Sequence, residues 1–193
     1  HDFRFELENV PLDDDLRAAL VPESRKAWDR FSPRGVVSAR GTAHREPGPG
    51  NRPRIPVEIH PEGSTLTFRE FPGEMRNVTG EILVDGDRIR ITRVRSQDGD
   101  ATVEVSGEIR DLTGDATVDV SIDARAVPRD DRRRRAASDD VRKTWELLSP
   151  GGSIDAHSRL TKEAGKELVH ATTLRARGNT VRHKDFPIEV SGL

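Results

Sequence analysis

The chain contains no cysteine, so it can form neither a disulfide nor a thiolate metal site. It also has no tyrosine, one methionine, six phenylalanines and two tryptophans. No apolar run approaches the roughly 18 residues that a membrane-spanning helix needs, and no signal peptide is recognisable. We therefore expect any membrane anchor to lie outside this segment.

An excess of one charge is lacking as well. Thirty-two basic residues (Lys and Arg) stand against 34 acidic ones, which gives a formal net charge of −2. Because nucleic-acid-binding domains are normally basic, the composition predicts no nucleic-acid partner. Apolar residues make up only 33% of the chain, whereas a closed globule of this size is usually richer in them. Sheets with one wet face need fewer buried positions.

Motifs that carry catalysis are missing. The sequence has no Gly-rich phosphate loop, no G-x-S-x-G and no H-E-x-x-H. Carboxylates are abundant, but nothing singles out two of them as a glycosidase pair. We predict a protein that is not an enzyme, with no catalytic residue, no metal and no cofactor.

Three evenly spaced histidines and a run of four arginines each have a functional and a structural interpretation. His157, His170 and His183 are thirteen residues apart, but without consistent facing or supporting carboxylates we interpret them as solvated strand histidines, not a metal site. Arginines 132–135 could bind phosphate or an anionic membrane. They stand beside aspartates at a predicted helix start, so we interpret them as a solvated helical face.

An internal repeat is the strongest positive feature of the sequence. At a constant offset of 117, Val10-Pro11 falls on Val127-Pro128, Trp28 on Trp145, Ser32-Pro33 on Ser149-Pro150 and Gly35 on Gly152. An ordered series of matches at one offset is the signature of a repeat architecture. The matched tryptophans are interpreted as pinning a helix to its sheet, although they could also be interfacial lipid anchors.

The repeat divides the chain into two predicted units. Residues 1–114 form a first strand–helix–β-meander unit, and residues 115–193 form a second, truncated one. The chain starts without Met, and its second copy stops at a point equivalent to about Gly80. We therefore expect a segment of a longer repetitive protein.

Alternation of apolar and polar residues predicts the strands of the first unit. Residues 2–10 alternate until Pro11, Asp13–Asp15 supply the cap of a helix that Pro22 restarts, and Ser32-Pro33 ends it. Further strands are predicted at 35–45, 54–60, 64–71, 76–84, 87–96, 101–110 and 115–126. The predicted turns are Pro61-Glu62-Gly63, Asp85-Gly86, Asp98-Gly99 and Thr113-Gly114. Such short connections favour an antiparallel meander.

The second unit repeats this plan, with a helix at 129–148 and strands at 151–161, 166–177 and 179–186. The stretch 46–53, EPGPGNRP, is predicted to be a flexible loop.

The predicted strands have one charged and one apolar face. The charged face includes Glu81, Arg88, Arg90, Glu104 and Asp119. The residues predicted to line the apolar face are Phe3, Phe5, Leu7, Val57, Ile59, Leu66, Phe68, Ile82, Val84, Ile89, Ile91, Val103, Val105, Val118, Val120 and Ile122.

These faces predict a mainly β fold with one α-helix per repeat: an elongated antiparallel β-sheet, curved into a groove and built from tandem repeats. A helix about 10 Å wide spans roughly two strand spacings, so much of the apolar face stays uncovered. An apolar patch of that size aggregates or binds something, and an acyl chain gains about 0.8 kcal/mol per buried CH₂. The alternative is a structural or adhesive β-repeat module with a closed core and no ligand.

The chain resembles the repeat region of AsmA-like and TamB-like envelope proteins, members of the bridge-like lipid-transfer group. The resemblance is carried by the VPLDDDLRAAL…W…FSPRG segment and by residues 68–110. In the latter, Phe71-Pro72 precedes a Val-Thr-Gly-Glu-Ile strand, and a second strand ends on Val-Ser-Gly-Glu-Ile. The inserted helix with its Trp and Ser-Pro looks like the Planctomycete-type members.

The resemblance implies a β-groove segment of a periplasmic protein of the cell envelope, anchored in the inner membrane by parts outside this chain. It implies a role in lipid transport and outer-membrane biogenesis. The expected partners are phospholipid or another acyl-chain lipid, and further repeats of the same chain.

Overall fold

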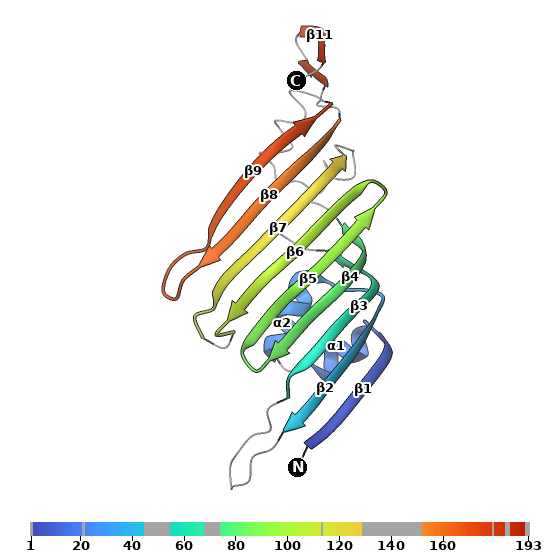
Figure 1. Cartoon of the computed structure of the whole chain (residues 1–193), viewed down its shortest axis with the longest axis vertical. Coiled ribbons are helices and arrows are strands. Elements are labelled where there is room, and N and C mark those ends of the chain that lie inside the picture. Colours follow the sequence, from blue (N-terminus) through green and yellow to red (C-terminus); the bar gives the residue numbers. More distant parts are fainter. Residues whose placement is uncertain are drawn as a thin grey trace.

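The computed structural model describes residues 2–20, 22–44, 55–67, 74–112, 114–128, 152–178, 180–183 and 186–191. They form one open, antiparallel, nine-stranded sheet in the sequential order β1 to β9, and a separate two-stranded sheet of β10 and β11 (Figure 1). The strands are β1 (Asp2–Pro11), β2 (Val36–His44), β3 (Val57–Thr67), β4 (Glu74–Asp85), β5 (Arg88–Asp98), β6 (Ala101–Arg110), β7 (Thr117–Pro128), β8 (Ser153–Lys162), β9 (Val169–Arg177), β10 (Thr180–His183) and β11 (Phe186–Ser191). A mainly β, antiparallel meander is therefore confirmed.

Two short helices, α1 (Asp14–Ala19) and α2 (Pro22–Phe31), follow β1. The Asp13 side chain caps α1 by accepting a hydrogen bond of 2.9 Å from the Leu16 amide. Pro22 opens α2, where a missing N–H costs nothing. Arg25 donates to the Ala18 and Leu20 carbonyls at the end of α1, so one guanidinium satisfies groups that the helix leaves unpaired. The predicted helix break at Pro22 is confirmed; the helix predicted at 129–148 and the loop at 46–53 lie outside the described residues.

The predicted turn at Pro61-Glu62-Gly63 is wrong. β3 runs through these residues from Val57 to Thr67, and Pro61 pairs with Val37 of β2. Gly63 has a φ of +74° and is the extra residue of a bulge against β4, between the Glu62–Thr79 and Ser64–Val78 pairs. Gly with positive φ is typical of bulges as well as of turns, which is why the sequence pattern misleads here.

Two strand glycines allow the sheet to bend. Gly80 and Gly107 stand in the matching motifs Val-Thr-Gly-Glu-Ile and Val-Ser-Gly-Glu-Ile, with φ of +141° and +144°. Each backbone lies against the next strand: a Cβ on Gly107 would collide with the Asp119 carbonyl oxygen and come within 2.7 Å of the Val120 Cα. Glycine is therefore required at both positions, as at the kinks of curved sheets.

Substitution of Gly107 by Ala should consequently destabilise the protein by about 2 kcal/mol, because strained backbone and a steric clash add. Gly114→Ala is the matched control, since Gly114 has no positive φ and its nearest neighbour would be the Asp111 oxygen at 4.0 Å. Urea unfolding of both variants measures the difference. Equal midpoints for the two variants would contradict this role of Gly107.

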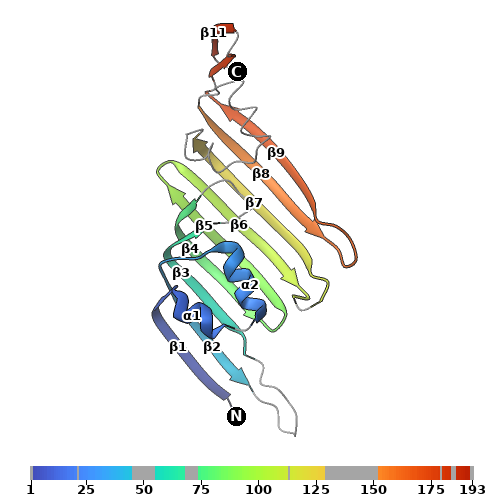
Figure 2. The ribbon, with the colours of Figure 1, turned by 180° about the vertical axis from the view of Figure 1, so that it is seen from behind.

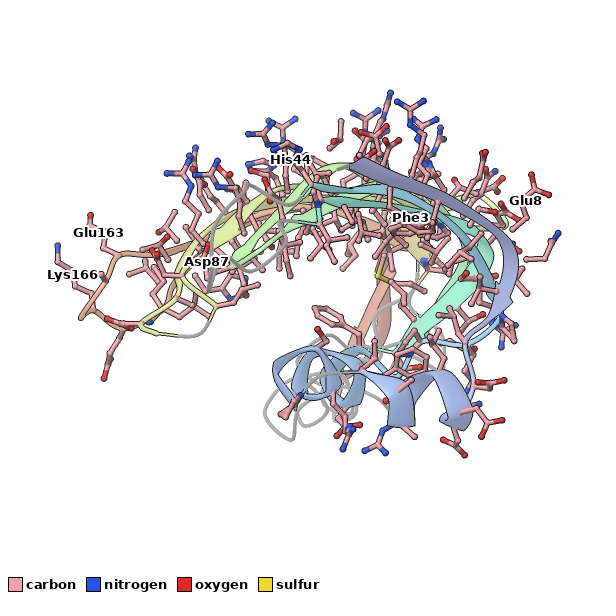
Figure 3. All side chains as sticks on the ribbon, turned by 90° about the horizontal axis from the view of Figure 1, so that it is seen from below. Phe3, Glu8, His44, Asp87, Glu163 and Lys166 are labelled. Atoms are coloured by element: carbon pink, nitrogen blue, oxygen red, sulfur yellow. The ribbon has the colours of Figure 1, made fainter. Side chains whose placement is uncertain are left out.

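The sheet has a convex polar side and a concave side on which the helices lie. Figure 2 shows α1 and α2 across the β2–β5 part of one face. Figure 3 shows the sheet as an arch above these helices, with Glu8 and His44 on the outer side. Arg34 and Thr65 exchange backbone hydrogen bonds of 2.9 and 2.8 Å, which fix the end of α2 to β3. Among the described residues, no second sheet packs on the concave face.

The pairs β1–β2 and β7–β8 have the same register at an offset of 117. Leu7 pairs with Ala39 and Ala124 with Ala156; beyond a bulge, the pairing resumes at Val10 and at Val127. The bulges contain Asn9 with φ +53° and Ala126 with φ +50°, again 117 residues apart. The sheet continues without a break between the two predicted units, because β6 pairs with β7 from Thr102 to Arg110.

Candidate ligand-binding face

The concave side of the sheet is predominantly apolar from β1 to β7, and we call it the apolar face. At β8 and β9 it becomes mixed, because Lys162, His170 and Thr172 lie on the same side. Directly opposed residues of antiparallel strands point to the same side of a sheet, so the register defines the face. One row crosses all nine strands through Leu7, Ala39, Ile59, Ile82, Ile91, Gly107, Val120, Leu160 and His170. A second row runs through Phe5, Gly41, Val57, Val84, Ile89, Ile109, Val118 and Lys162.

The predicted lining residues of β1 and β3 to β7 meet on this face. Val103 and Val105 pair with Ala124 and Ile122, which join Val120 on β7. Phe3 pairs with Ala43 at the β1 end of the same face. Leu66 pairs with Met75 beyond a second bulge. Phe68 lies outside the described residues.

Few of these side chains are fully covered. Val120 is buried with 8% of its surface exposed, whereas Phe3 is 67% and Leu7 48% exposed. The other predicted lining residues that the structure describes are half-buried. The apolar face is therefore neither a closed core nor fully open to solvent.

Sequence reasoning missed part of the buried core. Val37, Val78, Val94, Ala101 and Ala124 are each at most 8% exposed. Bulges hide one of them: Ile91 pairs with Gly107 but Val94 pairs with Val105, so one extra residue returns Val94 to the apolar face. Val37 and Ala101 lie near strand ends and Ala124 is small, so alternation is a weak signal there. Val78 pairs with Ser64 between two bulges of the β3–β4 ladder.

The β2 part of the apolar face consists of small residues under an aromatic ring. A Cβ on Gly41 would lie 2.5 Å from the Phe5 Cζ and 2.7 Å from the Pro56 carbonyl oxygen. The Phe5 ring thus covers the glycine directly, as an aromatic residue often does opposite a strand glycine. This contact closes the β1–β2 end of the face locally and leaves the middle strands as its most extended apolar region.

The opposite, convex side, which we call the polar face, is covered by ion pairs between strands. Arg93 reaches Glu104 at 3.0 Å, and Arg159 binds the Asp119 carboxylate through two hydrogen bonds of 3.1 Å. Glu108 accepts from Arg110 at 2.5 Å, and its other oxygen lies 3.1 Å from Arg88. Each exposed ion pair contributes only about 0–1 kcal/mol to the stability of the fold. Their main effect is to keep this side of the sheet hydrated. The predicted charged-face residues all lie here.

Four carboxyl groups have lowered pKa values. A hydrogen bond from Arg110 lowers the pKa of Glu108, one from Arg40 lowers that of Glu58, and Lys162 lowers that of Asp115. The backbone N–H of Ala126 lowers the pKa of Asp155, which thereby satisfies the amide of the β7 bulge at 2.9 Å. A carboxyl group with a lowered folded-state pKa stabilises the fold above its unfolded pKa and loses this contribution as the pH falls through the folded value.

We therefore expect the free energy of unfolding to fall as the pH drops below about 4.5, the ordinary glutamate value. Urea unfolding at pH 7, 5 and 3 tests this, and Glu108→Gln should flatten part of the acid loss. A midpoint that stays constant down to pH 3 would contradict the prediction.

One group on the polar face has metal-ligand chemistry. Ligand atoms of Glu58, His60 and Glu81 lie within 4.8 Å of one another. Arg40 already binds both Glu58 oxygens, at 2.9 and 2.6 Å, and neutralises this carboxylate. We therefore assign the group to the ion-pair network of the polar face.

The three histidines named from their spacing are not brought together. His157 pairs with Asp123 on the polar face, and its Nδ1 lies 2.8 Å from the Asp123 carboxylate. His170 pairs with Leu160 on the apolar face. The side chain of His183, like residues 129–150 with their arginine run and Trp145, lies outside the described residues. Trp28 is half-buried.

A shallow, open depression lies on the polar side, between Asn77, Thr79, Arg95, Gln97 and Gly99, away from the apolar face. Neither helix of the described chain is long and apolar enough to cross a bilayer. Comparisons with protein-family models, with curated proteins and with solved structures each gave no match.

Proposed function

We propose that this chain is a non-enzymatic segment of a cell-envelope protein whose apolar sheet face binds acyl-chain lipid and conducts it between membranes. The observation that supports the proposal is the apolar face, which runs across the sheet from β1 to β7 and most of whose large side chains remain half-exposed. Contiguous apolar surface of this extent on a soluble chain marks a binding surface.

The size of the face suits a lipid tail. With strands about 4.8 Å apart, the seven strands from β1 to β7 span roughly 29 Å. An acyl chain fills half of a hydrocarbon core about 30 Å thick, or about 15 Å. The face therefore has room for more than one chain in succession across the strands, and a surface of Val and Ile side chains holds no group that would fix a headgroup at one point. Both features favour passage over storage at a single site.

We further propose that the sheet is built from tandem repeats, each with a helical segment that covers part of the concave side. The matched register and the matched bulges of β1–β2 and β7–β8 support this proposal. In this account the parent protein lies in the periplasm and is anchored in the inner membrane by segments outside this chain. Lipid then passes along the sheet from repeat to repeat.

Mass spectrometry of organic extracts of the purified protein tests the proposal, with an unrelated β protein prepared identically as control. We expect near-stoichiometric phospholipid that is specific to this chain. A well-folded sample without bound lipid would instead favour the closed structural or adhesive module.

A further inference from the structure

Strand β1 is an edge strand of the described sheet, and we call its outer side the free edge. It pairs with β2 on one side, and among the described residues no strand lies along its other side. Its backbone groups on that side have no partner in the sheet, and its apolar side chains Phe3 and Leu7 are 67% and 48% exposed. A strand edge of this kind is a template for another strand.

The pairing of strand β7 indicates which kind of strand the free edge of β1 can bind. β7 repeats β1 at an offset of 117, with the same register and the same bulge toward the following strand. Unlike β1, β7 is paired on both sides, and β6 occupies the side that is free in β1. The bulge at Ala126 does not prevent this pairing, because it interrupts only the ladder to β8.

The free edge lacks most of the usual protection, since its charged side chains Arg4, Glu6 and Glu8 all lie on the polar face. Natural edges are blocked by charged side chains, especially lysine, by proline, by bulges or by a charge that points inward. Residues 2–8 of β1 contain no lysine and no proline, and their inward positions are Phe3, Phe5 and Leu7. The bulge at Asn9 faces β2, as its counterpart in β7 faces β8.

We propose that the free edge of β1 is a strand-addition site for an antiparallel strand with the residue pattern of β6. The pairs that β6 makes with β7, moved by 117 residues, give the register. Positions equivalent to Val103, Val105 and Gly107 stand opposite Leu7, Phe5 and Phe3 on the apolar face. Positions equivalent to Thr102, Glu104 and Ser106 stand opposite Glu8, Glu6 and Arg4 on the polar face.

This pairing is sterically matched. The residues that the incoming strand presents to the two Phe rings are valine and glycine, so large side chains meet small ones as Phe5 meets Gly41 within the sheet. Addition would extend the apolar face by one strand and cover Phe3 and Leu7. The proposal concerns recognition between strands and holds whether or not the apolar face binds lipid.

Disulfide trapping tests the register, because the chain has no cysteine to compete. Three single variants of the protein are made, Arg4→Cys, Glu6→Cys and Glu8→Cys. All three side chains are exposed, so the substitutions should not disturb the fold. Each is mixed in a glutathione redox buffer with a peptide of sequence 101–110 that carries Thr102→Cys, Glu104→Cys or Ser106→Cys. Directly opposed Cβ atoms lie within disulfide reach, whereas diagonal ones are about 7–8 Å apart.

We expect the matched pairs 4–106, 6–104 and 8–102 to form mixed disulfides at least fivefold faster than the other six combinations. Peptides of scrambled sequence with the same cysteine set the background rate. Uniform rates across the nine combinations, or rates no higher than those of the scrambled peptides, would overturn the proposal.

Discussion

Replacement of Val120 by Asp should destabilise the protein by about 3–5 kcal/mol, because it places a carboxylate without a partner in the buried part of the apolar face. Val120 is 8% exposed and lies between Gly107 and Leu160, neither of which offers a hydrogen bond from its side chain. A domain of this size has about 5–15 kcal/mol of stability in total, so the variant should lose much of its folded population.

The matched control introduces the same residue one position further along the strand. Ser121 lies on the polar face opposite Ser106 and Arg159, so Ser121→Asp should cost less than about 1 kcal/mol. Circular dichroism during urea unfolding compares the two variants. An equal loss of stability in both variants would contradict the assignment of Val120 to the apolar face and Ser121 to the polar face.

The second large effect concerns lipid binding. Ile91 is half-buried in the middle of the apolar face, beside Ile82 and Gly107, where an acyl chain has most apolar surface to contact. Ile91→Glu should weaken lipid binding at least tenfold, because a carboxylate against an acyl chain costs about 2 kcal/mol and each tenfold corresponds to about 1.4 kcal/mol.

Arg90→Glu is the control for this variant, since Arg90 is the preceding residue and lies on the polar face near Glu108. It should leave lipid binding unchanged. Titration with a fluorescent phospholipid measures both affinities, and a thermal melt confirms that each variant is folded. Equal affinities of the two variants for the lipid would refute a binding role for the apolar face.

Much of the sheet could be predicted from the sequence because its strands alternate cleanly over short turns. Residues such as Ile82, Ile89 and Ile91 identify their face by period two alone, and the two-residue connections at Gly86 and Gly99 leave little freedom for any topology other than a meander. The cap at Asp13 and the break at Pro22 follow from local chemistry and were predictable for the same reason.

Strand ends and the facing of residues could not be predicted from the sequence where the sheet contains bulges. Whether Gly63 ends a strand or adds one residue to it depends on what β4 offers across the ladder, which is a long-range property. Val94 illustrates the same limit, because its return to the apolar face follows from an extra residue in β5 that no local pattern announces. The extent to which the apolar face is covered also depends on long-range packing, and alternation alone fits an open and a closed face equally well.

Photo-crosslinking with a phospholipid that carries a diazirine in its acyl chain tests the central claim most directly. The protein is irradiated with the bound lipid, digested, and the modified residues are located by mass spectrometry. We predict adducts on apolar-face residues of the middle strands, such as Ile82, Ile91 and Val105, and few on their polar-face neighbours Leu83, Arg90 and Glu104. Adducts distributed equally over both faces, or an absence of adducts in folded protein, would contradict the claim.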